Sequence, residues 1–497
     1  MRLNQLYKNV PEKSIRIILF YGFSFAFVLL NAWLLLKKDT MLGVLIPAVL
    51  VILLTAIFEY QKLIWLVVFL TPLSVPLHEL YFGLPVDMFI PTEPLLFGIL
   101  ILFLFSFFRG KRIDKNITKH PVSIVIYVYL GWMIFTTFFS TLPLVSIKFV
   151  LTRIWYVLIF FFLMTYLFKD QKKIEQFVWL YTIAFVPVIG YTITRHIMFG
   201  LYDDQVAHWV MSPFFNDHTS YGAVLAMFIP FLLGLSLAKW MKPKQRIWLW
   251  ALLLILVVAE LLSYTRAAWL SLIISFGVWA ILKLKIKFKT LAITVVSIVL
   301  VLLLFQNQIL QKLEQNSTDS SANLTDHITS MTNISTDASN VERINRWQCA
   351  LQMFKEKPVF GWGPGTYAFN YAPYQLTSQR TIISTNSGDG GNAHSEYFGS
   401  LAEAGLLGML NFIVLIIVVL FTGVTAYSRT NDKRIKTILM SAIMGLVTYY
   451  IHSLLNNFLD TDKASVPFWG FTAMIVALDI YTRGEQKKTP TEQQTEL

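Results

Sequence analysis

Of the 497 residues in this chain, one histidine has the type and position best suited to chemistry. His394 follows a glycine-rich stretch and opens a long apolar run, which places it at a water–membrane boundary, where an imidazole can titrate near neutral pH. Such a side chain could take a proton from a hydroxyl group. The alternative is a histidine that caps the helix or lies at the interface. Asn392 is a plausible cap for this helix, and Glu396 falls in its first turn.

Arginines near the predicted outer ends of apolar segments form a second candidate group. Guanidinium groups bind phosphate well, often through two hydrogen bonds. Cations on the translocated side or inside a span need an explanation, because they oppose the usual charge bias or are costly. We favour an anion site for the group over separate pairing with Glu260, Glu396 or lipid headgroups. The residues are Arg195 beside His196, Arg266, Arg343 and Arg346, with Lys148, Arg153 and Arg380 as further cations.

The composition indicates an integral membrane protein. Hydrophobic residues make up 56% of the chain and charged residues only 14%. Soluble domains carry about 45–50% hydrophobic residues and about 25% charged residues, so the composition excludes soluble enzyme classes. The net charge of +12 lies in short clusters between apolar runs, which is typical of cytoplasmic loops and does not indicate nucleic-acid binding. The single cysteine, Cys349, excludes an intramolecular disulfide and a cysteine-rich metal cluster.

Apolar runs that could cross a bilayer recur along the chain and predict about 14 transmembrane helices. Basic loops such as 109–119, 239–246 and 283–289 predict that both termini are cytoplasmic. The fold class is therefore an all-α polytopic membrane protein. Its expected parts are helices 1–11 in residues 1–305, an extracytoplasmic loop in 306–393, helices 12–14 in 394–482 and a disordered cytoplasmic tail in 483–497. The expected spans lie near 16–36, 41–58, 62–78, 94–108, 121–140, 143–168, 174–197, 219–239, 246–264, 267–283, 288–306, 394–427, 435–456 and 464–482.

The predicted outer loop contains structure of its own. Its first part, 316–340, is rich in Ser, Thr, Asn and Asp and is expected to be flexible. VERINRWQCALQMFKEK then has helical spacing, which predicts an amphipathic helix with Ile344, Trp347, Leu351 and Phe354 on one side. The following PVFGWGPGTYAFNYAPY predicts a turn segment rich in glycine, proline and aromatic residues.

Three of these segments together resemble the O-antigen ligase/polymerase family. They are SYTRAAWLSLI, RINRWQCALQMFKEKPVFGWGPGTY and NAHSEYFGSLAEAGLLGML, and SPFFNDHTSYGAVLAMFIP is also similar, so that the resemblance covers about residues 211–425. The family consists of bacterial multi-span glycosyltransferases with a large extracytoplasmic loop. The resemblance implies a GT-C-like helical fold in the inner (cytoplasmic) membrane, an active site on the periplasmic side, and no metal, nucleotide sugar or other cofactor.

The resemblance also implies a reaction and assigns residues to it. A glycan moves from a polyprenyl pyrophosphate carrier, such as undecaprenyl pyrophosphate, to a sugar hydroxyl. A ligase of lipopolysaccharide assembly uses lipid A–core as the acceptor, and a polymerase uses another lipid-linked repeat unit. By motif position, His394 is the catalytic histidine and Arg266 is the arginine of the SYTR turn. Arg343 or Arg346 matches the arginine before the tryptophan of the loop helix, and Arg195 is carried over without a sharp surrounding motif.

The chemistry of these residues agrees with that reaction. Arginines can neutralise a pyrophosphate leaving group while the glycosidic bond breaks. A general base typically contributes about 10²- to 10⁴-fold, and His394 could fill that role for the acceptor hydroxyl. Direct displacement would invert the anomeric centre. The loop aromatics Trp347, Trp362 and Tyr367 could stack on sugars or serve as interfacial anchors.

Two other classes compete with a glycosyltransferase. One is a lipid-linked oligosaccharide flippase or another transporter, and the other is a scaffold subunit of an envelope assembly. Transporters usually have paired halves, short loops and a midplane site, whereas the unusual residues here cluster at the outer face beside one large loop. Within the family we favour a ligase over a polymerase, on the arrangement of the His-x-x-x-Phe and Pro-x-x-Gly-x-Gly segments. A protein-targeting ligase also fits, and the glycan, its linkage, the acceptor and the oligomeric state stay open.

Overall fold

The computed structural model of the chain describes residues 21–33, 59, 61–80, 88–110, 113–285, 338–375 and 391–486. The chain forms two units, 1–64 and 65–497, and the candidate site residues belong to the second. The predicted spans 41–58 and 288–306, Arg380 and the tail beyond residue 486 lie outside the described residues. Two predicted boundaries shift by a few residues. The loop helix begins at Ala338, inside the stretch 316–340 that was expected to be flexible. The last helix ends at Gln486, beyond the expected end of the last span at residue 482.

Within these ranges, eight helices are long and apolar enough to cross a membrane. They are Pro143–Leu167, α10 (Gln171–Phe199), α12 (His218–Ser236), α13 (Pro243–Leu262), α14 (Arg266–Lys283), α20 (Glu396–Arg429), α21 (Lys433–His452) and α22 (Asp462–Gln486). Four shorter apolar helices are Tyr21–Trp33, Gln61–Leu73, α5 (Thr92–Phe108) and α7 (Pro121–Thr137). The predicted class of an all-helical, multi-pass membrane protein is therefore confirmed, while the total of about 14 spans and the orientation stay predictions.

Short elements connect or extend these helices. The span Pro143–Leu167 is built from α8 (Pro143–Tyr156), the π-helical segment η4 (Val157–Leu163) and α9 (Met164–Leu167). Strands β1 (Val75–Pro76) and β2 (Phe89–Ile90) pair antiparallel. The remaining elements are η3 (Thr71–Leu73), α4 (Leu77–Leu80), α6 (Lys115–Thr118), α11 (Asp204–Ala207), α18 (Ala338–Glu356), α19 (Tyr367–Asn370) and η5 (Ala372–Tyr374).

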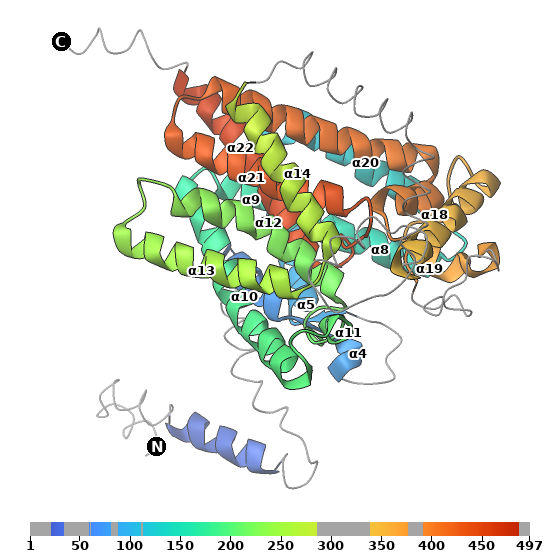
Figure 1. Ribbon diagram of the computed structural model, residues 1–497, viewed down its shortest axis with the longest axis horizontal. Helices are drawn as coiled ribbons and strands as arrows, with labels where there is room; N and C mark the ends of the chain where they lie inside the picture. Colours follow the sequence, from blue (N-terminus) through green and yellow to red (C-terminus); the bar gives the residue numbers. More distant parts are fainter. Residues whose placement is uncertain are drawn as a thin grey trace, which may run out of the picture. The chain divides into compact units, whose positions relative to one another are not determined.

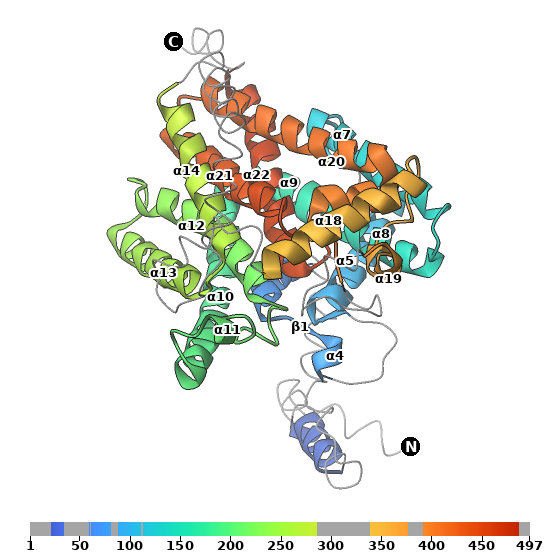
Figure 2. The same cartoon turned by 45° about the vertical axis from the view of Figure 1, so that its right-hand side comes forward.

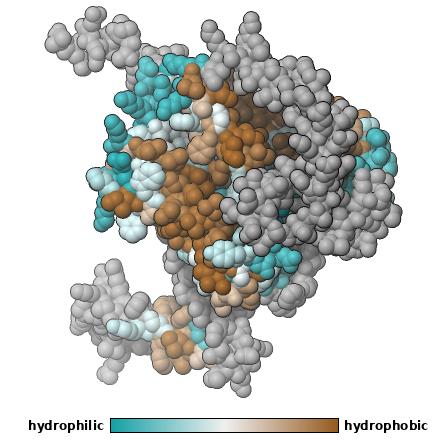
Figure 3. Space-filling view, in the orientation of Figure 1, coloured by the Kyte–Doolittle hydropathy of each residue, from teal (hydrophilic) through white to brown (hydrophobic). Residues whose placement is uncertain are grey.

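Two helices form the centre of the second unit. α12 packs against α13, α14 and α21, and α21 also contacts α20 and α22 (Figure 1). Most of the membrane-length part of α12 is buried, 89%, against only 22% for α14. Hydrophobic side chains gather on the outer surface over α13 and α14 (Figure 3). A helix that is apolar on its exposed side is expected where lipid replaces water as the solvent.

The helix of the predicted outer loop, α18, lies across α20 (Figure 2). Its buried side differs from the predicted one, because Leu351 is exposed and Trp347 is only partly buried. The buried stripe is instead Glu342, Asn345, Arg346, Cys349, Ala350 and Met353. Hydrophobic periodicity failed here because two charged residues neutralise each other inside the interface: Arg346 Nε donates to Glu342 Oε1 over 2.6 Å.

A kink in α20 receives the Gly/Pro turn of the loop. Gly405 has φ +68°, and a Cβ there would lie 2.1 Å from the Val359 carbonyl oxygen. At the kink, the Leu406 amide donates to the Pro358 carbonyl over 3.1 Å. The Ala404 carbonyl accepts the indole N–H of Trp132 from α7 over 2.8 Å. The interrupted helix thus offers backbone groups that fix the turn before α19 in place.

The substitution Gly405→Ala tests this junction. The positive φ and the close Val359 carbonyl predict a loss of about 1–3 kcal/mol of folding free energy. We expect a lower thermal unfolding midpoint for the detergent-purified variant. Gly131→Ala on α7 is the matched control, because no heavy atom lies within 4 Å of its added Cβ. Equal midpoints for the two variants would contradict the close packing of the turn against the kink.

Candidate functional site

His394 sits in a short segment, 391–395, that leads into α20. Its backbone adopts φ +47°, in the left-handed region that non-glycine residues rarely occupy. The conformation is held on both sides: the His394 N–H donates to Asn392 Oδ1 over 3.0 Å, and its carbonyl accepts the indole N–H of Trp347 over 3.2 Å. Ser395, and not Asn392 as predicted, caps α20, because its hydroxyl accepts the Phe398 N–H. Asn392 fixes the histidine instead.

The imidazole of His394 is anchored through one nitrogen only. It is hydrogen-bonded to the Asn456 side chain, and within the described ranges its Nδ1 has no hydrogen-bond partner. The Asn456 amide nitrogen also lies 3.1 Å from Nε2 of His452, so this amide connects the two histidines. Nδ1 is thereby left available to a bound group.

The electrostatic environment keeps this imidazole neutral. Burial lowers the pKa of His394 to about 4, and the positive charges of Arg343 and Arg346 act in the same direction. The Asp217 carboxylate opposes them. An ordinary histidine has a pKa near 6.5, so His394 stays unprotonated across the neutral range. A neutral imidazole can accept a proton there, although as a weak base.

The two arginines of the loop helix occupy different environments. Arg346 is buried, pairs with Glu342 and has its guanidinium 3.8 Å from the centre of the Tyr371 ring. Arg343 is only partly buried, and its charge acts on His394, His452 and His218. Of the two arginines that the sequence did not separate, Arg343 is thus the one whose charge acts on all three histidines, whereas Arg346 acts on His394.

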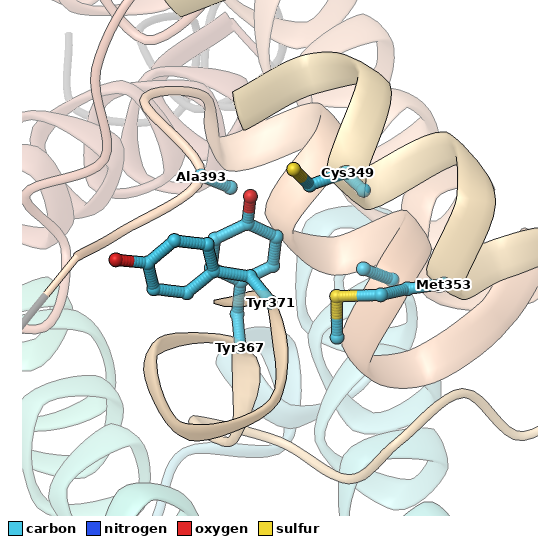
Figure 4. Close-up of a cluster of buried hydrophobic side chains, with 7 residues drawn as sticks. Cys349, Met353, Tyr367, Tyr371 and Ala393 are labelled. Carbon is cyan, nitrogen blue, oxygen red and sulfur yellow. The ribbon is translucent and has the colours of Figure 1, made fainter. Parts of the chain in front are cut away.

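Packing beneath Arg346 fixes the position of α18. The rings of Tyr367 and Tyr371 stack with centroids 5.4 Å apart, between α18 and the segment of Ala393 (Figure 4). A Cβ on Gly391 would lie 1.9 Å from the Arg346 guanidinium, so this glycine lets segment 391–395 pass close to the arginine in its observed position. The buried pair of Arg346 and Glu342 on α18 thus sets the distance between α18 and segment 391–395. It does not face open space.

The SYTR turn brings Arg266 to the same place. Tyr264 has φ +51° in the tight turn between α13 and α14, as the short spacing predicted. The Thr265 hydroxyl donates to the His218 carbonyl over 2.8 Å and thus ties the turn to the start of α12. Arg266 follows as the first residue of α14, and its charge acts on the His218 imidazole. The charges of two guanidinium groups from distant segments, Arg266 and Arg343, therefore act on the same histidine.

Sequence reasoning missed a group of polar residues at this site. Asp217 caps α12 by accepting the Ser220 N–H over 2.7 Å, and His218 stacks on His208 with ring centroids 4.1 Å apart. His452 ends α21, four residues before Asn456. The one signal was that Asp217 and His218 fall within a segment quoted for the family resemblance. No sequence motif pointed to His452 and Asn456, because His452 ends an apolar span and Asn456 lies in a loop without a recognisable motif.

Arg195 lies in a different setting. Its guanidinium donates to the carbonyls of Val210 and Ser212 and lies among the rings of Tyr191, Phe199 and Trp209. No contact in the described part of the chain joins it to His394. Arg195 braces the loop that leads to Asp217, and its role in anion binding stays a prediction.

The loop aromatics serve as supports in this structure. Trp347 donates to the His394 carbonyl and stacks on Phe398 with centroids 5.4 Å apart. Tyr367 is 2% exposed and its hydroxyl donates to the Arg346 carbonyl over 2.7 Å. Trp362 is partly buried, and its indole N–H donates to the Met353 carbonyl over 3.0 Å. Whether any of the three also contacts a sugar stays a prediction.

A cavity of about 130 Å³ lies beside segment 392–396, with Arg153, Glu396 and Glu403 among its lining residues. Glu396 accepts hydrogen bonds from the Phe458 and Leu459 amides and lies 3.8 Å from the Arg153 guanidinium. Arg153 thus has the Glu396 partner that we considered as an alternative to an anion site. Among the described residues, no cluster of three or more His, Cys, Asp or Glu side chains is placed to hold a metal ion.

These observations define a polytopic helical membrane protein with a histidine–arginine site at one end of α12, α14 and α21. Residues 251–413, which include Arg266, Arg343, Arg346 and His394, match the model of a family described as O-antigen ligase. The predicted resemblance to the O-antigen ligase/polymerase family is therefore confirmed. Its members are membrane glycosyltransferase-like ligases and polymerases.

One similar curated protein is an uncharacterized protein of Haemophilus influenzae. It is 22% identical over 263 residues, which cover 52% of this chain and 63% of the relative. The chain thus spans less than two thirds of the length of that relative.

The protonation state of His394 can be measured directly. We expect its acylation by diethyl pyrocarbonate, followed by mass spectrometry of the peptide, to rise with pH around a midpoint of about 4. A model histidine has a midpoint of about 6.5. Arg343→Gln removes a positive charge that lowers the pKa of His394, so the midpoint should move upward. A wild-type midpoint near 6.5, or one that Arg343→Gln leaves in place, would contradict the described environment.

Proposed function

We propose that this protein transfers a glycan from a polyprenyl pyrophosphate carrier to a sugar hydroxyl of an acceptor on the outer side of the cytoplasmic membrane, as an O-antigen ligase does. The observation that carries the proposal is the neutral imidazole of His394. Its Nδ1 lone pair is unused within the described residues, and it lies in the field of two arginines inside the matched family domain. This combination suits deprotonation of a hydroxyl next to an anionic leaving group.

Binding of the donor would use the cations that converge on the histidines. Arg343 and Arg266 both act on His218 from opposite segments, so a pyrophosphate between them would meet guanidinium groups on two sides. Arg266 also opens α14, and the positive end of a helix dipole favours an anion there. Arg346 contributes its charge from a buried position, where its pairing with Glu342 holds it in place.

The proposed chemical step is a single displacement. The acceptor oxygen attacks the anomeric carbon of the donor, and the bond from that carbon to the pyrophosphate oxygen breaks. The acceptor proton passes to Nδ1 of His394, and the polyprenyl pyrophosphate leaves with the electron pair of the broken bond. The arginines stabilise the charge that develops on the leaving oxygen. Attack opposite the leaving group inverts the anomeric centre.

Binding of the donor would increase the basicity of His394. In the described state its pKa is lowered to about 4 by burial and by Arg343 and Arg346. A bound pyrophosphate brings negative charge that offsets those arginines, so the pKa of His394 rises in the donor complex. The base would then become stronger only when the substrate that needs it is present.

Ligase and polymerase reactions share this step and differ in the acceptor. A ligase transfers to lipid A–core or another surface glycan, and a polymerase transfers to a second lipid-linked repeat unit. We propose the ligase, on the arrangement of the His394–Phe398 and Pro358–Gly363 segments. The reaction is proposed to need no metal ion, so transfer in membranes should persist after chelation of divalent cations.

Replacement of His394 by alanine is the first functional test. We expect glycan transfer to fall by about 10²- to 10⁴-fold at a normal membrane level of the protein, because the proton acceptor is lost. The measurement is the amount and chain length of lipid-linked glycan that accumulates in cells. Long accumulated chains indicate a ligase, and single repeat units indicate a polymerase.

His78→Ala is the matched control for this test, because the side chain of His78 is exposed, 57%, on the short helix α4. It should transfer glycan as the wild type does. Full transfer by His394→Ala would overturn the proposed mechanism. Translocation of a fluorescent lipid-linked oligosaccharide by purified protein in vesicles would support the transporter instead.

The pH dependence of transfer separates the free enzyme from the donor complex. The kcat/KM for the donor should stay constant from about pH 8 down to about pH 5, because His394 is neutral above its lowered pKa of about 4. The kcat should begin to fall at a higher pH, because the bound pyrophosphate raises that pKa. Coincident acid limbs for kcat and kcat/KM would show that the donor does not act on the base.

A further inference from the structure

A groove lies at the end of α12, α14 and α21 that is remote from His394. It has a volume of about 440 Å³ and is lined by residues of those helices and of the last turns of α20. The loops that follow or precede these helix ends are rich in Lys and Arg, which predicts a cytoplasmic location. The site of His394 and Arg266 lies at the opposite ends of the same three helices.

The walls of the groove are apolar. Leu233, Leu237, Phe276, Met440 and Met444 are among the apolar side chains along its length. The helices approach closely behind these walls, since a Cβ on Gly234 would lie 2.1 Å from the Ser441 hydroxyl. Phe276 stands beside the exposed apolar surface of α14, so the groove continues a face that is suited to lipid chains.

The mouth of the groove carries two cations. Lys283 lies at the end of α14 and Lys436 in the first turn of α21, and both line the groove. Their ammonium groups lie 4.7 Å from the Trp279 ring centre and 5.6 Å from that of Tyr427, respectively. Within the described ranges, neither forms an ion pair with an acidic side chain.

The nearest acidic residue on the same turn is used elsewhere. Asp432 caps α21, where its carboxylate accepts the Arg434 and Ile435 amides over 2.7 and 3.3 Å. Among the described residues, Asp432 forms no ion pair with Lys283 or Lys436. An apolar groove that ends between two lysines and two interfacial aromatic side chains matches an amphiphile with an anionic head.

We propose that this groove binds one anionic glycerophospholipid of the cytoplasmic leaflet. Its phosphate lies between Lys283 and Lys436, and an acyl chain lies along Leu233, Phe276 and Met440. The apolar walls favour a lipid over a soluble phosphate, because a soluble anion would leave them in contact with water. The two lysines favour an anionic headgroup over a zwitterionic one, since each cation near a headgroup contributes to the attraction. This site does not depend on the proposed glycan transfer.

Native mass spectrometry of the purified full-length protein tests the proposal. The probes are phosphatidylglycerol and phosphatidylcholine, added in matched amounts to the detergent-solubilised protein. The wild type should bind one phosphatidylglycerol preferentially. Each of Lys283→Gln and Lys436→Gln should weaken that binding about fivefold, and the double variant about 30-fold. Lys433→Gln is the matched control, because Lys433 is exposed on the same turn of α21 but does not line the groove.

A second variant separates the groove from general surface charge. Leu233→Trp fills the groove and leaves both lysines unchanged, so it should also weaken phosphatidylglycerol binding while the thermal midpoint stays near that of the wild type. Unchanged binding by Leu233→Trp would overturn the groove, and equal losses for Lys433→Gln and Lys283→Gln would overturn the assigned cations. Full displacement of the lipid by inorganic phosphate would show a simple anion site and would overturn the proposal.

Discussion

The carboxylate of Glu396 organises the residues around His394. It is buried at the start of α20 and accepts the Phe458 and Leu459 amides and the Tyr449 hydroxyl over 2.9–3.0 Å. The Glu396 amide in turn donates to the Ser453 carbonyl over 3.0 Å. These bonds join the segment that carries His394 to the segment that carries Asn456. Because a buried carboxylate must have its lone pairs satisfied, this junction is expected to be rigid.

The rigid junction explains how an imidazole can be held with one nitrogen unused. His394 is fixed through its backbone by Asn392 and Trp347 and through its ring by Asn456. The surrounding arginines are also held, Arg346 by Glu342 and Arg266 by its position after the turn that Thr265 ties to α12. Preorganised charge of this kind loses little energy to reorganisation when an anion binds, which is the condition for electrostatic catalysis in the proposed reaction.

The two ends of the central helices have opposite designs. At one end, α12, α14 and α21 present Asp217, Arg266 and His452 to a polar site. At the other end, the same helices frame an apolar groove between Lys283 and Lys436. In the predicted orientation, the polar end serves the proposed lipid-linked substrate. The end with the groove serves the proposed lipid of the opposite leaflet. The buried middle of α12 and α21 connects the two sites through a packed core.

The sequence by itself determined the class of the protein, because bilayer thickness and charge bias act on local composition. Most described helices fall where apolar runs predicted them, and the SYTR turn and the loop helix 338–356 were expected from local pattern. The family resemblance followed from motifs that are contiguous in the chain. Local pattern also led to errors. The predicted cap of α20 was Asn392, but Ser395 caps the helix. The buried side of α18 was also misplaced, since periodicity counts hydrophobic residues and cannot detect that Arg346 and Glu342 neutralise each other.

Only the tertiary structure decided which residues share the site. Asp217, His218, His452 and Asn456 lie far from His394 in the sequence, and no pattern links them to it. The burial of Arg346 and the partial exposure of Arg343 depend on how α18 lies across α20. The ring of His394 is hydrogen-bonded to Asn456, 62 residues further along the chain. Contacts of this kind arise from packing, and packing is a property of the folded chain alone.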